Sequence, residues 1–198
     1  MRSFISILFV LVVANEIAEV VQLPKSNNFE LNGFTIRESY ILNHKEKFVI
    51  ASQETADNTD IEGLRLLYIK EGKVEFNSQH VGESYIYRPT FFKFKNNKML
   101  IVCEQGFEYS AGVDVFEFED RHIKMIGNLD IASDVDENPV SIVPNMTIES
   151  KYGDQYEFRF KGTVVLNPGG TQESKISGEK LTGVYLKETG KISLMIKH

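Results

Sequence analysis

Residues 90–129 read TFFKFKNNKMLIVCEQGFEYSAGVDVFEFEDRHIKMIGNL. Four strand patterns follow one another in this stretch, at 90–95, 99–103, 113–118 and 123–126, because β-branched and aromatic residues suit the pleated surface of a sheet. Turn-forming residues separate them at Asn96-Asn97, between Gly106 and Gly112, and at 119–122. The stretch therefore predicts four antiparallel strands in a row, and it decides the fold class because the same pattern occurs elsewhere in the chain.

The pattern recurs at a spacing of about 50 residues, at which arrays of repeated sheets are suspected. The hairpin sequence Leu67-Tyr-Ile-Lys-Glu-Gly-Lys-Val returns near the end of the chain as Val184-Tyr-Leu-Lys-Glu-Thr-Gly-Lys-Ile. We therefore predict about three repeat-like units, at 39–76, 90–129 and 147–196. Common ancestry and convergence on ordinary hairpin chemistry both remain open as explanations.

The predicted fold class is all-β. Beyond the N-terminal segment, no window shows the 3.6-residue apolar period of an amphipathic helix. We expect residues 19–198 to form a single domain of antiparallel meander units, stacked as a sandwich or as an open, irregular, propeller-like assembly. A closed propeller usually takes about four to eight blades, which is more than these units provide.

The N-terminus has the layout of a secretory signal. Arg2 is followed by a short apolar run at 4–14, broken only by Ser6. The run is about half of the roughly 20 residues that span a bilayer, so we expect no stable membrane insertion after its removal. We predict a signal peptide at 1–18, with cleavage after Ala14 or Ala18, and export to a bacterial periplasm or the medium. The single cysteine, Cys103, cannot form an intrachain disulfide, and export without disulfides favours a bacterial envelope.

Composition narrows the classes of partner. The 22 basic and 28 acidic residues give a net charge of -6, which argues against non-specific binding of nucleic acid. No Gly-rich phosphate loop precedes a helix, and no His-Glu-x-x-His spacing occurs, so no cofactor is expected. Lysines near the C-terminus would block pairing of sheet edges, which favours a monomer.

Two groups of aromatic residues are candidates for ligand or partner binding. The connection at 105–112 carries Phe107, Glu108 and Tyr109 between two buried strands, and loops on a rigid sheet often hold binding residues. These aromatics can stack on a sugar or a partner side chain, or fold down over the end of the sheet. Tyr85 and Tyr87 share one face of their strand, either as an exposed patch or as cross-strand packing.

An acidic stretch is a weak candidate for calcium. Asp134, Asp136 and Asn138 have the alternate spacing of the first half of a calcium loop. Pro139 stands where that loop has glycine, and Asn145 stands where it has its distal acid. We therefore favour a solvated connection between sheets and expect no metal.

The sequence favours an exported, non-catalytic β module: a binding, inhibitor or immunity-type protein, or an envelope accessory. Its partner would be a protein or a glycan outside the cytoplasm. The alternative is an extracytoplasmic hydrolase acting on a polymer through carboxylates such as Glu104 or Glu54, each just after the second strand of its unit. Placement of Glu104 in a cleft opposite a second carboxylate would favour the hydrolase.

Overall fold

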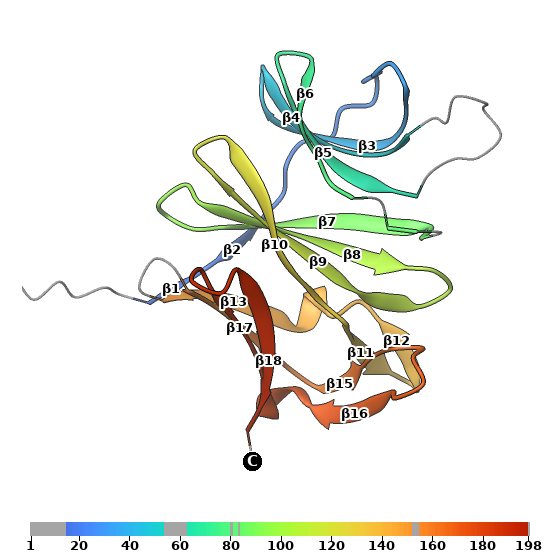
Figure 1. Cartoon of the computed structure of the whole chain (residues 1–198), viewed down its shortest axis with the longest axis vertical. Helices are drawn as coiled ribbons and strands as arrows, with labels where there is room; N and C mark the ends of the chain where they lie inside the picture. The colour runs from blue at the N-terminus through green and yellow to red at the C-terminus, as the bar shows by residue number, and fades with distance from the viewer. Residues whose placement is uncertain (1–14, 54–62, 80, 83, 152–154, 198) are drawn as a thin grey trace, which may run out of the picture.

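The computed structural model describes residues 15–53, 63–79, 81–82, 84–151 and 155–197, and it arranges them as stacked layers of antiparallel sheet (Figure 1). The first sheet has the order β3 (Phe34–Asn43), β4 (Glu46–Gln53), β5 (Arg65–Lys70), β6 (Lys73–Asn77). The central sheet has the order β10 (His122–Leu129), β9 (Ser110–Glu119), β8 (Met99–Gly106), β7 (Ile86–Lys93), β2 (Glu19–Val21). The all-β prediction and the four strands predicted within 90–129 are confirmed.

The first sheet covers one face of the central sheet, and two further sheets cover the other face. The third sheet has the order β1 (Glu16–Ile17), β13 (Met146–Lys151), β14 (Gln155–Phe160), β17 (Leu181–Leu186), β18 (Lys191–Ile196). The fourth has the order β12 (Asn138–Val140), β11 (Ile131–Val135), β15 (Thr163–Leu166), β16 (Ser174–Ser177). Two single-turn 3-10 helices, η1 (Val143–Asn145) and η2 (Gly178–Lys180), lie between strands. None of these four sheets is closed.

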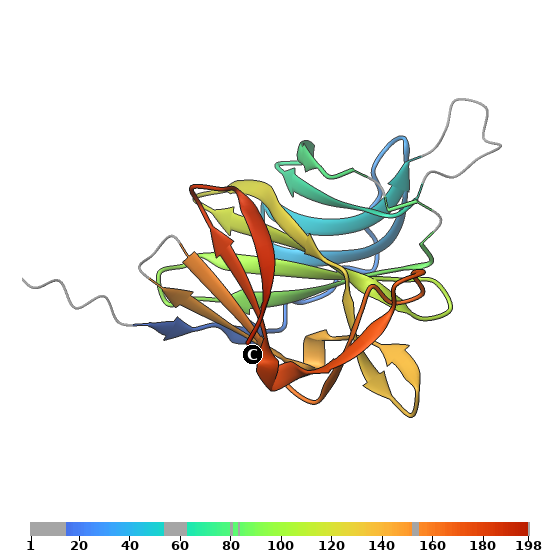
Figure 2. The same ribbon diagram turned by 60° about the horizontal axis from the view of Figure 1, so that its bottom comes forward.

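The stretch predicted as the third unit, 147–196, is divided between two sheets. After β14 the chain turns at Gly162, which has a φ of 72°, and the hairpin β15–β16 pairs with β11 instead of continuing the third sheet. The chain then returns through η2 to β17, which pairs with β14. The strand β10 likewise continues into β11, so the central and fourth sheets share a run of chain (Figure 2). The repeated hairpin pattern predicts about three units, and so it does not reveal the fourth sheet.

The central sheet is buried on both faces. Alternate residues of β8 point to opposite sides: Leu100 and Val102 join the core shared with the third and fourth sheets, whereas Ile101 and Cys103 join the core shared with the first sheet. This two-sided burial explains the continuous apolar run at 99–103, which does not alternate as a half-buried strand would.

An aromatic cluster holds the first sheet to the central sheet. Phe48 of β4 lies 5.7 Å from Phe91 of β7 and 5.1 Å from Phe118 of β9, measured between ring centroids. Tyr68 of β5 lies 5.2 Å from Phe118. Edge-to-face and offset pairs of this kind stabilise a core beyond the area that they bury.

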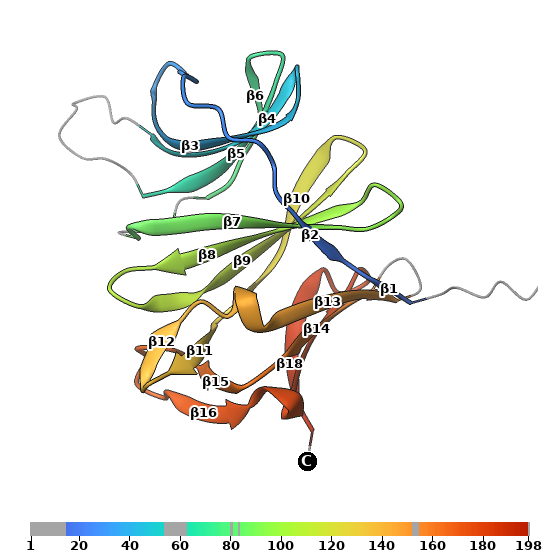
Figure 3. The ribbon, with the colours of Figure 1, turned by 180° about the vertical axis from the view of Figure 1, so that it is seen from behind.

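The N-terminal segment runs along one edge of two layers. β2 pairs with 91–93 of β7, and Lys25 then bridges to Tyr40 of β3 in the first sheet (Figure 3). Among the described residues, the 86–90 part of β7 pairs only with β8. Along 86–90, the edge of β7 that faces away from β8 therefore has no paired strand among the described residues.

We predict that Glu117→Gln makes stability less dependent on acidic pH. Burial opposes ionisation of Glu117, but hydrogen bonds from Lys124 and Tyr156, aided by the charges of Lys124 and Lys98, outweigh it and lower its pKa. The ionised form thus stabilises the fold above the unfolded pKa of about 4.3, and this stabilisation is lost as pH falls through the lower folded pKa.

Urea unfolding at several pH values tests this. At neutral pH the variant should lose about 2 kcal/mol relative to the parent, and the difference should shrink below about pH 4. Glu119→Gln is the matched control, since Glu119 is about half-exposed and pairs with Lys98 at 3.3 Å. A constant difference at all pH values would contradict the assignment.

Candidate functional site

A cleft of about 820 Å³ opens between the first and central sheets, at the end where β4 finishes and β7 begins. Sites for small ligands commonly have volumes of about 300–1,000 Å³. The first sheet and the start of β5 contribute Arg37, Glu38, Ile50, Ser52, Gly63 and Leu64. The other wall is Gly82, Ser84, Tyr85, Ile86, Tyr87 and Arg88. The cleft thus combines an apolar floor with polar groups and one exposed aromatic ring.

The alternation of β4 explains why the cleft forms at this end. Glu46, Phe48, Ile50 and Ser52 occupy every second position, so all four share the face toward the central sheet. Phe48 and Ile50 are core residues that hold the layers together. Ser52 follows where that core ends, and there the two layers separate.

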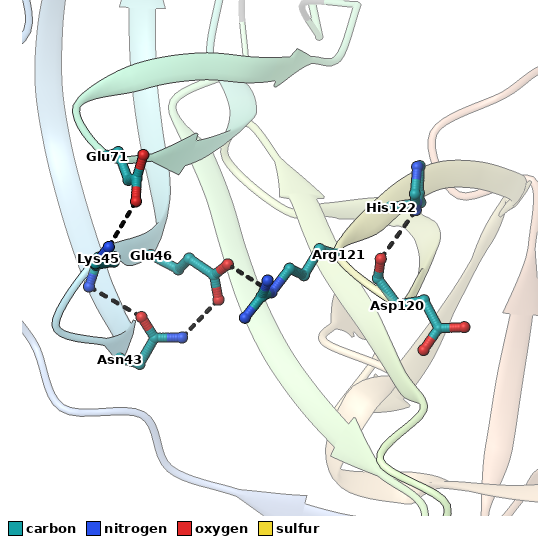
Figure 4. A network of polar contacts seen from close by, with 7 residues as sticks. All are labelled: Asn43, Lys45, Glu46, Glu71, Asp120, Arg121 and His122. Atoms are coloured by element: carbon teal, nitrogen blue, oxygen red, sulfur yellow. Dashed lines mark hydrogen bonds and ion pairs between the residues drawn. The ribbon is translucent and has the colours of Figure 1, made fainter.

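At the opposite end of the interface an ion pair connects the two layers (Figure 4). Glu46 is buried; its carboxylate accepts a hydrogen bond of 2.5 Å from Asn43 Nδ2 and lies 3.1 Å from Arg121 Nε. Arg121 belongs to the β9–β10 turn of the central sheet. It has a φ of 64° and Asp120 one of 50°, the left-handed values of a tight two-residue hairpin turn. An ion pair therefore joins the layers at this end, beside a smaller pocket of about 260 Å³ between β5–β6 and the β9–β10 turn.

Gly63 and Gly82 allow the two walls of the cleft to come into contact. A Cβ atom at Gly63 would lie 1.8 Å from the carbonyl oxygen of Gly82. The segments before β5 and before β7 consequently run against each other, backbone to backbone. Any larger residue at position 63 would push these walls apart.

Arg37, Arg88 and Ser52 have hydrogen-bonding capacity to spare. Among the described residues Arg37 makes no hydrogen bond or ion pair, and Arg88 Nη1 lies 3.8 Å from Glu104 Oε2, beyond hydrogen-bonding distance. The Ser52 hydroxyl is buried and has no partner there.

Glu38, by contrast, is already engaged. Its carboxylate accepts hydrogen bonds from Lys25 Nζ at 2.8 Å and from Tyr40. Although burial favours its neutral form, these donors outweigh burial and lower the pKa of Glu38. The carboxylate in the cleft is therefore held ionised and oriented.

Both predicted tyrosines reach the cleft, in different environments. Tyr85 is 79% exposed, whereas Tyr87 is 4% exposed and belongs to the core. The Tyr87 hydroxyl donates to Asp114 Oδ2 at 2.8 Å, and Asn128 Nδ2 donates to Asp114 Oδ1 at 3.0 Å. Burial nevertheless raises the pKa of Asp114. Burial also raises the pKa of the neighbouring Cys103, whose thiol therefore remains protonated.

The other predicted binding residues lie outside the cleft. Phe107, Glu108 and Tyr109 form a three-residue connection between β8 and β9, shorter than the predicted 105–112 loop. Tyr109 packs over Gly169 in the β15–β16 turn, since a Cβ at Gly169 would lie 2.1 Å from its hydroxyl oxygen. Glu104 is 8% exposed and faces Arg88. The other acid of the hydrolase hypothesis, Glu54, lies outside the described residues.

The acidic stretch forms the hairpin of β11 and β12. Asp136 and Glu137 take φ values of 51° and 65° in its turn, and Asn138 Nδ2 donates to the carbonyl oxygen of Asp136. Asp134 pairs with Lys175 Nζ at 2.8 Å. Within the described ranges, no group of three His, Cys, Asp or Glu residues is placed to hold a metal ion.

Sequence reasoning missed Arg37, Ser52 and Arg88 as cleft residues. Arg88 directly follows Tyr87 in the sequence, and this position beside the predicted tyrosines could have identified it as a cleft residue. Arg37 and Ser52 lie on strands about 35 to 50 residues before it, and only the stacking of the two sheets brings them together.

We predict that Tyr87→Phe destabilises the protein by about 1–3 kcal/mol, because the buried Asp114 loses a hydrogen-bond donor. Tyr85→Phe is the control, since that side chain is exposed and should change stability by less than about 0.5 kcal/mol. Urea denaturation of the three proteins measures the difference. Equal stability of the Tyr87 variant and the parent would show that this hydrogen bond contributes nothing.

Comparison of the chain with protein-family models, with curated proteins and with solved structures finds no match. In the part of the chain that the structure describes, no helix has the length and apolar character needed to cross a membrane. The cleft is thus interpreted from its own residues.

Proposed function

We propose that this protein is an exported, non-catalytic binding module, and that its ligand binds in the cleft between the first and central sheets. The observation that carries the proposal is the cleft itself, with the exposed ring of Tyr85, the exposed Arg37 and Arg88, whose ion pair with Glu104 is long at 3.8 Å. A concave site with an apolar floor and a few convergent polar groups is the usual form of a ligand site. Its partner is a glycan or a protein outside the cytoplasm.

The polar groups of the cleft support recognition better than catalysis. Glu38 is held ionised by Lys25 and Tyr40, which does not suit a carboxylate that must donate a proton. Asp114 lies behind Tyr87 and is hydrogen-bonded to Tyr87 and Asn128. Glu104, the candidate of the hydrolase hypothesis, is paired with Arg88 outside the cleft lining.

We also propose that the chain arose from repeated units. β3–β6 and β7–β10 each form four adjacent antiparallel strands, and β13, β14, β17 and β18 form a third such set. The two echoing hairpin sequences, at 67–74 and 184–192, both join the last two strands of their sets. Repetition of a four-stranded meander accounts for both observations.

If the chain is exported through its N-terminal segment, we predict cleavage after Ala14 and a mature N-terminus at Asn15. Residues 1–14 lie outside the described residues, but β1 pairs with β13, and the Ala18 amide donates to the carbonyl oxygen of Ile148 at 2.9 Å. Cleavage after Ala18 would remove these interactions from the edge of the third sheet.

Mass spectrometry of the exported protein identifies its first residue. Ala14→Asp should block processing, because the cleavage site requires a small residue there. A mature chain beginning at Glu19, or a full-length chain retained in the cytoplasm, would contradict the prediction.

We predict that Tyr85→Ala weakens ligand binding while leaving the melting temperature nearly unchanged, because the ring is exposed. Two-dimensional NMR of the labelled protein, titrated with a library of glycan and peptide fragments, identifies the binding surface. Amide shifts are expected at 37–38, 52, 63–64 and 84–88.

Phe107→Ala serves as the matched control, since this aromatic lies on a neighbouring loop outside the cleft. It should leave the titration unchanged. Shifts confined to 107–109, or loss of binding in the Phe107 variant alone, would move the site to that loop and overturn the proposed cleft.

A further inference from the structure

Among the described residues that line the cleft, Arg37 and Arg88 are positively charged and Glu38 is negatively charged. Lys25 and Glu104 lie beside them, paired with Glu38 and Arg88 respectively. The chain as a whole carries a net charge of -6. The described arginines of the cleft are therefore groups that can attract an anionic ligand to an otherwise acidic protein.

The two arginines are available to such a ligand. Arg37 is exposed and has no partner among the described residues, and Arg88 is only loosely paired with Glu104 at 3.8 Å. The negative charge of Glu38 is met mainly by Lys25 at 2.8 Å, with a smaller contribution from the charge of Arg88. A guanidinium group binds a carboxylate through paired, parallel hydrogen bonds, which makes arginine well suited to recognise this group.

Ser52 adds a second, independent sign of a ligand. Its residue is 2% exposed, its hydroxyl has no hydrogen-bond partner among the described residues, and it lines the cleft. Buried polar groups almost always have a partner, and leaving one without costs free energy. A ligand hydroxyl in the cleft would satisfy it.

The unpaired edge of β7 bears on whether a ligand would be recognised through the backbone or through side chains. A peptide could in principle add as a strand to 86–90, which pairs only with β8 among the described residues. Pro89 lies in this stretch and has no N–H, so such a strand would lack a donor in its middle. Recognition through side chains is therefore favoured over recognition through the backbone.

We infer that the cleft binds a carboxylate-bearing saccharide, about the size of a disaccharide. Arg37 and Arg88 bind its carboxylate, Ser52 binds a ring hydroxyl, and the exposed ring of Tyr85 stacks on the apolar face of a sugar ring. This inference rests on the proposed function and specifies the ligand class of the same site.

Calorimetric titration of the mature chain tests the inference with four probes. Digalacturonate and N-acetylmuramic acid carry carboxylates, galactobiose is the neutral counterpart of the first, and an Asp-Glu dipeptide is an acidic non-saccharide. At least one acidic saccharide should bind. If digalacturonate binds, galactobiose should bind at least about tenfold more weakly, because it has no carboxylate to accept charge-assisted hydrogen bonds.

Variants locate the interaction. Arg37→Gln and Arg88→Gln should each weaken binding of the acidic saccharide about tenfold. Arg159→Gln should leave it unchanged, because Arg159 is a partly exposed arginine of the third sheet, paired with Glu149 and Glu157. Ser52→Ala should weaken binding without loss of stability, since its hydroxyl has no partner to lose.

The outcomes separate the inference from the proposed function. Equal binding of digalacturonate and galactobiose, or binding of the dipeptide alone, would overturn the acidic saccharide while the cleft remains the site. Failure of both acidic saccharides to bind at millimolar concentration would also overturn it. The proposed function falls only if, in addition, no fragment in the NMR titration shifts the amides of the cleft.

Discussion

The fold depends on burying both faces of the central sheet. A sheet with one wet face can alternate apolar and polar residues, but a middle layer has to be apolar at consecutive positions. The strand β8 meets this requirement, with Leu100 and Val102 toward one core and Ile101 and Cys103 toward the other. Because each face needs a separate covering layer, this one sheet imposes the stacked architecture on the rest of the chain.

The cleft follows from how the first layer covers the central one. The rings of Phe48, Tyr68, Phe91 and Phe118 fill the middle of this interface. On one side of them the buried Glu46 meets Arg121, and on the other side the buried Ser52 lies in the wall of the cleft. A single row of alternate residues on β4 thus begins with an ion pair, passes through a core and ends at the cleft.

In the proposed site, groups that stabilise the fold lie next to groups that are exposed at the cleft. Next to the cleft, the buried Tyr87 hydroxyl donates a hydrogen bond to the buried Asp114, and this bond stabilises the fold. Arg37, Arg88 and Tyr85, by contrast, are exposed at the cleft and are not part of the hydrophobic core clusters. A rigid layered scaffold with adaptable groups at one rim is an arrangement typical of binding proteins.

The sequence by itself determined the strands and their turns, because alternation, β-branched and aromatic residues and turn formers act over a few neighbouring positions. It also predicted that Tyr85 and Tyr87 share one face of a strand, since the side-chain period of a strand is two, although β7 begins after Tyr85, at Ile86. Only the tertiary structure decided that Tyr87 is covered and Tyr85 is not, and that the hairpin β15–β16 joins a fourth sheet. It alone brought Arg37 and Ser52 to Arg88, because which sheet stacks on which, and where two layers separate, is set by contacts between residues distant in the chain.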